Sequence, residues 1–408
     1  TVAIGSRALN SQNFTTATNS YNTAVGADAG LAVTTGVKNT IIGGLAGDAM
    51  TIGFNNTVVG YDALGANRNS GANVAIGYEA LKVFDNTTSA SHFNTAVGTQ
   101  AGKALTTGIE NTLIGGLAGD ALTDADYNTS VGGANLSSDT LGSQSTAIGY
   151  GALVTQNFTT ATNTGNTAVG YNAGTAVTTG TANTFVGSLA GDGTNDGNQN
   201  VAVGTNALSA NCDNDNTGIG AYSLQACTGA QNTCLGSHAG HDVTSGGNLL
   251  LLGKDAGRST APGGSHTDGS NSIVVGDNNS ANAYIKIDWT VTSDERDKTD
   301  FTALDLGLDF VKSMKPYTFK WDQRSDYGDS TADDYKVIDQ TPDGTHKKDQ
   351  LDVGFKAQDI EELEKAAGYK IDDKTNLVAS LSQDETQYGL KYSKFIPILV
   401  KAIQEQNA

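Results

Sequence analysis

The stretch Asn22-Thr23-Ala24-Val25-Gly26 decides the fold, because its pattern returns along the first two thirds of the chain. The word Asn-Thr-x-Val/Ile-Gly recurs with small changes, for example at Asn56-Thr57-Val58-Val59-Gly60 and at Asn232-Thr233-Cys234-Leu235-Gly236. The glycines that close these words stand at positions 5, 26, 43, 60, 77, 98, 115, 132, 149, 170, 187, 204, 220, 236, 253 and 276. A fixed period of this kind is the sequence signature of a repeat architecture.

The glycine spacing carries a second layer of order. The interval from Gly5 to Gly77 equals the interval from Gly77 to Gly149, and each divides into steps of 21, 17, 17 and 17. After Gly149 a third set begins with 21, 17 and 17 and then loosens. The insert Gln-Asn-Phe-Thr-Thr-Ala-Thr-Asn occupies residues 12–19 and again 156–163. We infer duplication of a block of four coils.

A 17-residue period restricts which repeat structure the chain can form. It is too short for helix-pair repeats, which need about 33 residues or more. β-Branched pairs bounded by Gly and Asn are typical of short strands between tight turns. The expected fold class is therefore mainly β: a parallel β-solenoid, or β-roll, over residues 1–280, with rungs about 4.8 Å apart. Such a thin coil has little core, so we expect a trimer to complete the burial.

Three coils carry the sequence Ala-Ile-Gly, at Ala3-Ile4-Gly5, Ala75-Ile76-Gly77 and Ala147-Ile148-Gly149. With these motifs the coils resemble the head repeats of trimeric autotransporter adhesins. The resemblance covers roughly residues 1–280 and implies a left-handed parallel β-roll packed as a trimer.

A second domain is expected over residues 281–408, because the composition changes there. Seventeen of the 24 Lys and Arg residues and both tryptophans, Trp289 and Trp321, lie in this part. The patterns predict a small α+β domain that ends in a helix. The expected elements are strands over 284–289 and 317–321, an amphipathic segment over 304–316, a polar loop over 322–350, a helix beginning over 354–363 and a terminal helix over 392–404.

Four motifs follow one another in this domain: Ser-Asp-x-Arg-x-Lys at 293–298, Leu-Asp-Phe-Val-Lys-x-Met-Lys-Pro at 308–316, Gly-Phe-x-Ala-Gln-Asp at 354–359, and Leu-x-Tyr-Ser-Lys-x-Ile-Pro-x-Leu-Val-Lys-Ala at 390–402. In this order they resemble the intramolecular chaperone of endosialidases and other phage tail spikes and fibres. The resemblance covers about residues 289–408. It implies that this domain trimerises first and that the solenoid then winds from that seed, since tethering reduces the entropic cost of nucleation.

The family is also classed as an auto-processing peptidase. Carried over, the resemblance implies cleavage of the Thr292–Ser293 bond, with Ser293 as the nucleophile and Lys298 as the general base. Lys can serve as a base where desolvation favours its neutral form. The neighbouring acidic residues Asp294, Glu295 and Asp297 oppose this. In the alternative interpretation, Ser293-Asp294 caps a helix and Lys298 is a surface charge.

One position departs from the family pattern. Many relatives place a His two residues before the Gly of the Gly-Phe-x-Ala-Gln word, and this chain has Asp352 there. His346 is nearby in sequence but out of register. We therefore expect the chaperone domain to stay attached.

The functional prediction is a structural and receptor-binding fibre of a virion, a tail fibre, assembled as a homotrimer in the host cytoplasm. Its expected partners are a host surface receptor, a glycan or an outer-membrane component, and other tail proteins reached through an N-terminal segment that precedes Thr1. A net charge of −19 argues against nucleic acid, and no apolar run approaches the roughly 20 residues that span a bilayer. No cofactor is expected. The alternatives are a polysaccharide-depolymerising tail spike, an enzyme, and a bacterial trimeric surface adhesin.

Four weaker patterns lie in the repeats, and no metal site is expected from them. Cys212, Cys227 and Cys234 are expected to be free thiols, since the first two lie one residue out of the coil register. His238 and His241 near Cys234 could bind a metal but are more typical of turn residues. Residues 192–198 have the look of a calcium loop without its distal Glu, and a solvated turn is expected. Tyrosines 61, 78, 150 and 171 could stack on sugars or form a ladder between coils.

Overall fold

The chain forms two compact units in a computed structural model that describes residues 1–280, 283–286, 290–328 and 335–407. The solenoid unit comprises Thr1–Leu250 with Ser270–Ser272, and the C-terminal unit comprises Leu251–Gly269 with Ile273–Ala408. Among the described residues, no helix is long and apolar enough to cross a membrane. Each unit is described separately below.

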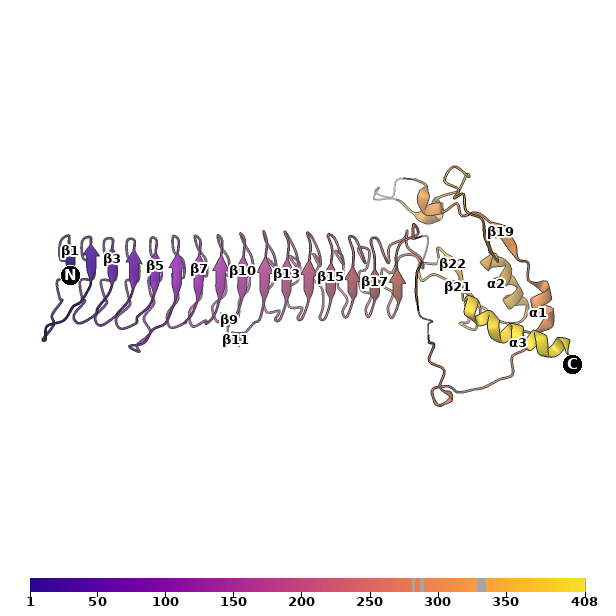
Figure 1. The fold of residues 1–408 in the computed structure, drawn as a ribbon, viewed down its shortest axis with the longest axis horizontal. Coiled ribbons are helices and arrows are strands. Elements are labelled where there is room, and N and C mark those ends of the chain that lie inside the picture. Colours follow the sequence, from indigo (N-terminus) through magenta and orange to yellow (C-terminus); the bar gives the residue numbers. More distant parts are fainter. Residues whose placement is uncertain (281–282, 287–289, 329–334, 408) are drawn as a thin grey trace. The chain divides into compact units, whose positions relative to one another are not determined.

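Short strands, one for each coil, follow one another side by side in sequence order (Figure 1). Neighbouring strands pair in parallel and in register, so that Thr40 lies opposite Thr57 and Ile41 opposite Val58. The predicted solenoid of short, regular coils is confirmed. The strands of this sheet are β1 (Val2–Ile4), β2 (Thr23–Val25), β3 (Thr40–Ile42), β4 (Thr57–Val59), β5 (Val74–Ile76), β6 (Thr95–Val97), β7 (Thr112–Ile114), β8 (Thr129–Val131), β10 (Thr146–Ile148), β12 (Thr167–Val169), β13 (Thr184–Val186), β14 (Val201–Val203), β15 (Thr217–Ile219), β16 (Thr233–Leu235), β17 (Leu250–Leu252) and β18 (Ile273–Val275).

The repeated word explains both the strand and the turn that follows it. The middle residue of each strand points inward, and Ala24, Ile41 and Val58 are fully buried. The two flanking residues point outward, as the two-residue period of a strand requires. The closing glycine then has a positive φ, +138° at Gly98, and a Cβ there would lie 2.4 Å from the carbonyl oxygen of Gly115 in the next coil. Only glycine fits this position without strain.

Buried asparagines tie each coil to its neighbours. The backbone N–H of Asn111 donates to Oδ1 of Asn94 at 3.0 Å, and that of Asn128 donates to Oδ1 of Asn111 at 2.9 Å. Nδ2 of Asn111 also donates to the Ala125 carbonyl at 2.7 Å. We call this column the asparagine ladder. Its members are Asn22, Asn39, Asn56, Asn73, Asn94, Asn111, Asn128, Asn166, Asn183, Asn200, Asn216 and Asn232.

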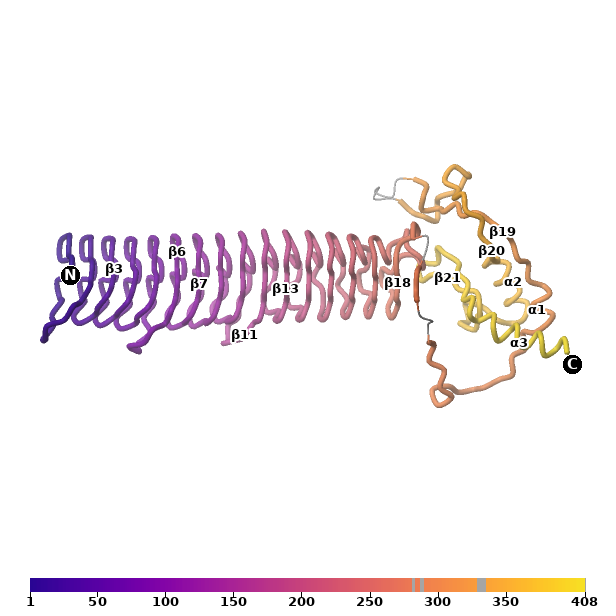
Figure 2. Tube along the Cα trace, in the orientation of Figure 1, coloured from indigo at the N-terminus to yellow at the C-terminus, as the bar shows by residue number. Residues whose placement is uncertain are grey.

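In one long coil, a glutamine side chain takes the place of a missing ladder asparagine. Ser145 stands where the ladder would have an asparagine, and its N–H donates to Asn128 Oδ1 at 2.8 Å. Gln156, the first residue of the insert, donates to Ser145 Oγ at 2.9 Å and accepts from Asn166 Nδ2 at 2.9 Å. The insert residues also form β11 (Thr162–Asn163), which pairs with β9 (Gly142–Ser143) and lies at the edge of the stack of coils (Figure 2).

The C-terminal unit is α+β around a small apolar core and ends in a helix, as predicted. The core residues Leu306, Phe310, Ile360, Val378, Ala379, Phe395 and Ile398 come from helices and loops far apart in sequence. Its helices are α1 (Leu308–Ser313), α2 (Ala357–Ala366) and α3 (Phe395–Gln406), its 3-10 turns are η1 (Glu295–Asp297), η2 (Arg324–Asp326), η3 (Val337–Asp339) and η4 (Tyr392–Lys394), and its antiparallel strand pairs are β19 (Tyr317–Phe319) with β20 (Asp352–Gly354) and β21 (Ala379–Leu381) with β22 (Tyr388–Leu390).

The prediction of a strand over 284–289 is wrong for the described residues 284–286. Residues 284–286 form no strand, and 287–289 lie outside the described residues. Tyr284, Ile285 and Lys286 are exposed and have no neighbouring strand, among the described residues, to complete a ladder. Alternation alone does not form a strand, since a strand needs a pairing partner.

Candidate functional site

The two residues of the predicted dyad, Ser293 and Lys298, lie in hydrogen-bonding contact. Lys298 Nζ donates to Ser293 Oγ at 2.5 Å and to the Ser293 carbonyl oxygen at 3.2 Å. The turn η1 lies between the two residues and brings them onto one side. Asp294 caps this turn, because its side chain accepts from the Arg296 N–H at 2.9 Å. The geometry therefore places a serine hydroxyl and a lysine amine within hydrogen-bond reach, as a nucleophile and its base require.

The dyad is exposed and has an ionised carboxylate next to it in the sequence. Ser293 and Lys298 are both exposed, as is Thr292 on the other side of the predicted scissile bond. A general base must be neutral to accept the serine proton, and burial is the usual means of favouring a neutral amine. Asp294 keeps its negative charge, since its hydrogen bonds with Arg296 hold the pKa of its carboxyl below the usual value. The structure thus contains both the helix cap formed by Asp294 and the contact between Ser293 and Lys298.

Asp352 has a role of its own, separate from the dyad. It lies in β20, opposite Phe319 of β19. Its Oδ2 accepts from Trp321 Nε1 at 3.1 Å and its Oδ1 from the Val353 N–H at 2.8 Å. In the described part of the chain, no hydrogen bond joins Asp352 to Ser293 or Lys298. The nearby His346 instead packs edge-on against Tyr327, with ring centroids 4.7 Å apart.

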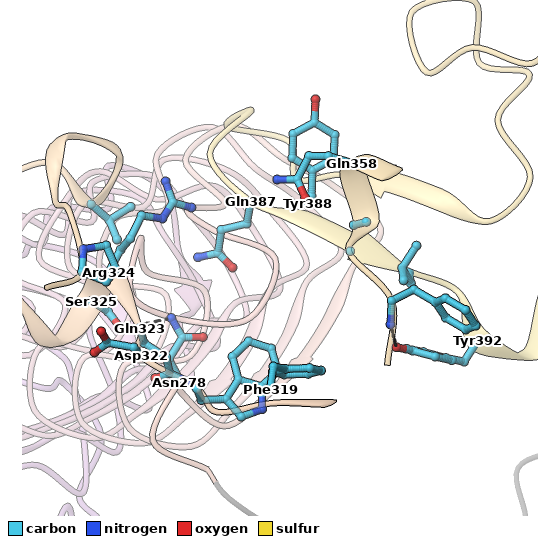
Figure 3. A pocket seen from close by; sticks show the side chains of 17 residues that line it. Asn278, Phe319, Asp322, Gln323, Arg324, Ser325, Gln358, Gln387, Tyr388 and Tyr392 are labelled. Atoms are coloured by element: carbon cyan, nitrogen blue, oxygen red, sulfur yellow. Dashed lines mark hydrogen bonds between the residues drawn. The ribbon is translucent and has the colours of Figure 1, made fainter. Parts of the chain in front are cut away.

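A cavity of about 580 Å³ lies within the C-terminal unit, and sequence reasoning missed it. Figure 3 shows that its side chains come from β19 and η2 on one side and from β22 and η4 on the other. Its one local signal in the sequence is the alternating run Phe319-Lys320-Trp321, and alternation of this kind predicts a strand, not a cavity. Its lining residues are Asn278, Phe319, Trp321, Asp322, Gln323, Arg324, Ser325, Val337, Pro342, Phe355, Ala357, Gln358, Gln387, Tyr388, Gly389, Leu390 and Tyr392.

The weaker candidates of the solenoid unit have structural partners. Tyr61 stacks on Tyr78, and Tyr150 on Tyr171, each pair with ring centroids 6.0 Å apart, which is the geometry of a ladder between coils. His238 stacks on Tyr222 at 5.0 Å. Among the described residues, no group of three or more His, Cys, Asp or Glu side chains is arranged to hold a metal ion.

The three cysteines are buried, and no disulfide joins them in the part of the chain that the structure describes. The segment 192–198 is a turn. Burial raises the pKa of Cys227 to about 12. Asn198 Oδ1 accepts a hydrogen bond of 2.8 Å from the backbone N–H of Thr181 in the preceding coil. The polar groups of this turn therefore stabilise contacts between coils.

Comparison with known proteins bears on the C-terminal unit alone. No curated protein and no solved structure matches the chain. A family model described as the chaperone of endosialidase matches residues 293–369. The matched segment begins at Ser293, contains Lys298 and Asp352, and runs through α1, β19, β20 and α2. The chain thus combines a β-solenoid with a C-terminal segment that matches the endosialidase chaperone family.

Proposed function

We propose that this chain is a tail fibre of a virion, a structural and receptor-binding component in which the C-terminal unit drives homotrimer formation and folding of the solenoid. The match over residues 293–369 supports the chaperone part of this proposal. The repetitive solenoid supports the structural part, because stacked coils build a long regular element from little sequence information. The host surface is the proposed site of action, and a glycan is the proposed receptor.

The exposed face of α3 is the single observation that carries the trimer. Phe395, Ile398 and Ala402 of this helix are buried in the core of the unit. On the other side Ile396, Leu399, Val400 and Ile403 are between 42 and 63% exposed. Their spacing places them along one helix face. A helix that is apolar on both sides needs a further partner to remove the second face from water.

An apolar recess adjoins this face. Its volume is about 560 Å³, and Ala303, Leu304 and Pro397 line it together with Ile396 and Val400. Burial of such a surface against copies of the same helix would stabilise the assembly by roughly 25 cal/mol for each Å² of apolar area removed from water. A symmetric trimer gives each copy the same contacts.

The solenoid unit exposes a second apolar surface. The third residue of each strand points outward, and Ile114, Ile148 and Ile219 are among its exposed members. Because the strands are in register, these side chains form one aliphatic column along the sheet. Three chains in the same register can bury this column against one another.

Deletion of residues 281–408 tests the chaperone role. We expect the full chain to be recovered as a soluble trimer and the truncated chain as monomer or aggregate, because the solenoid then lacks its seed. The measurement is light scattering after size-exclusion chromatography. A soluble trimer of the truncated chain would contradict the proposal.

Intact mass spectrometry tests self-cleavage at Thr292–Ser293. We propose that the chaperone stays attached, since the dyad is exposed and Asp352 is bonded to Trp321. The freshly expressed chain should then have a single mass, as should Ser293→Ala and Lys298→Ala. A fragment that begins at Ser293 in the unaltered chain and is absent from both variants would show self-cleavage instead.

A further inference from the structure

Aromatic rings line the cavity of the C-terminal unit on two sides. Phe319 and Trp321 meet edge to face with centroids 5.3 Å apart, and Trp321 keeps 51% of its surface exposed. Tyr388 and Tyr392 contribute two further exposed rings. Exposed aromatic faces in a concave site offer large, rigid contact area to a ligand. The C–H faces of sugar rings are a natural match to such planes.

Amide side chains make up much of the rest of the lining. Oε1 of Gln323 is buried and has no hydrogen-bond partner among the described residues. A buried acceptor without a partner costs free energy unless a ligand or water donates to it. Gln358 lies across the cavity, and its side chain is exposed. Primary amides carry donors and an acceptor together, so they fit vicinal hydroxyl groups.

The charged side chains of the cavity balance each other in sign and already form hydrogen bonds within the protein. Arg324 Nη2 donates to the Thr386 carbonyl at 2.5 Å. The two oxygens of Asp322 accept from Tyr327 OH at 2.7 Å and from the Gly344 N–H at 2.8 Å. These are the two charged residues among the lining residues, one of each sign. A ligand with net charge would have no surplus counter-charge to meet.

We propose that this cavity binds a neutral oligosaccharide, with a sugar ring on Trp321 and a hydroxyl donating to Gln323 Oε1. The volume of about 580 Å³ lies within the range of small-molecule sites. Asp352 acts as a positioning residue, because its hydrogen bond to Nε1 fixes the orientation of the indole ring. The inference rests on the proposed receptor-binding role and places the glycan site in the retained C-terminal unit.

Tryptophan fluorescence of the full chain tests this proposal. The chain has two tryptophans, so Trp289→Phe leaves Trp321 as the one tryptophan reporter. In this background the probes are maltohexaose, chitohexaose, and hexasaccharides of mannose and of galactose. We expect at least one to change the Trp321 emission saturably and to protect it from acrylamide quenching. The same sugar should bind about tenfold more weakly by calorimetry to Trp321→Ala and to Gln323→Leu.

Tyr284→Ala is the matched control, since Tyr284 is an aromatic residue that is 93% exposed and lies outside the cavity. It should leave binding unchanged. Failure of all four sugars to bind or to protect Trp321 would overturn the proposal, as would cavity variants that bind as tightly as the unaltered chain. Light scattering on the same samples reports the trimer separately. Trimer without sugar binding would therefore reject the cavity site and leave the proposed assembly intact.

Discussion

Asn111 holds its coil through three contacts at once. It is fully buried, its N–H donates to the preceding coil, its Oδ1 accepts from the next coil, and its Nδ2 donates to Ala125. The sequence showed an asparagine at the head of each repeated word, but it did not reveal whether that side chain was buried. An asparagine in an exposed turn gives the same letter at the same period. Only the stacking of coils decides that these amides are removed from water.

Asn111→Ala should therefore destabilise the solenoid by about 1–3 kcal/mol, the cost of leaving buried backbone groups without partners. Chemical denaturation followed by circular dichroism measures this free energy of unfolding. Asn10→Ala is the control, because Asn10 is exposed and should change it by less than about 0.5 kcal/mol. Equal stability of the two variants would contradict a stabilising role of the ladder.

Asp48, Asp120 and Asp192 occupy the same place in the three successive four-coil blocks, and burial raises the pKa of each carboxyl. The folded state therefore holds its proton to a higher pH than the unfolded chain, in which the pKa is about 3.9. Above the folded pKa the buried charge lowers stability. As the pH falls through the folded pKa towards the unfolded value, this penalty disappears.

Asp120→Asn removes the charge and keeps the shape. We expect it to raise the melting temperature at pH 7 and to match the unaltered chain near pH 3, where both side chains are neutral. Thermal unfolding at the two pH values is the measurement. Asp124→Asn, at an exposed position in the same coil, serves as the control. A lower melting temperature of Asp120→Asn at pH 7 would show that the carboxylate stabilises the fold.

At the scale of the element, the coil is set by its closing glycine. Gly98 has φ +138°, and a Cβ there would meet Gly115 O at 2.4 Å. Gly116, one residue after the next closing glycine, has room: its Cβ would approach only Thr99 O, at 4.0 Å. Both are glycines of the same sheet edge, but one is required and the other is not.

Gly98→Ala should cost about 3 kcal/mol or more, because backbone strain adds to the clash with the next coil. Gly116→Ala should be neutral within about 0.5 kcal/mol. Denaturation midpoints of the two variants give the comparison. If both substitutions were tolerated, the tight stacking of coils at Gly115 would be wrong.

The elements that the sequence predicted well are those set by local pattern. The strands before Gly26, Gly43 and Gly60 follow from a repeated word, and the terminal helix from the spacing of apolar residues. The cavity could not be predicted in this way, because Trp321 and Tyr388 meet only through the tertiary fold. The Ser293–Lys298 contact was expected from the resemblance, and η1 places it. Whether this contact is catalytic stays a prediction.

A buried glutamate between α2 and β21 is another contact that the sequence pattern does not predict. Glu364 of α2 accepts from the backbone N–H groups of Leu377, Val378 and Ala379 at 2.7–3.0 Å. By residue type alone, a glutamate in a helix is expected at the surface. The structure instead makes it the group that joins α2 to β21.

At the scale of the whole molecule, two apolar surfaces are exposed, and the proposed trimer buries both. The aliphatic column belongs to the solenoid unit, and the exposed face of α3 belongs to the C-terminal unit. Each is an apolar surface that would gain stability by burial against another chain. The net charge of −19 keeps such chains soluble and opposes indiscriminate association. The proposed trimer therefore requires a specific seed, and we propose that the exposed face of α3 provides it.

Light scattering on the full chain beside Ile396→Asp/Ile403→Asp tests this account most directly. These two substitutions put charge on the exposed face of α3 and leave the buried face, with Phe395 and Ile398, unchanged. The matched control is Gln406→Glu, which adds charge at an exposed polar position of the same helix. We predict that the unaltered chain and the control have three times the chain mass of 41.8 kDa and that the double variant does not. A monomeric unaltered chain, or a double variant that remains trimeric, would contradict the account.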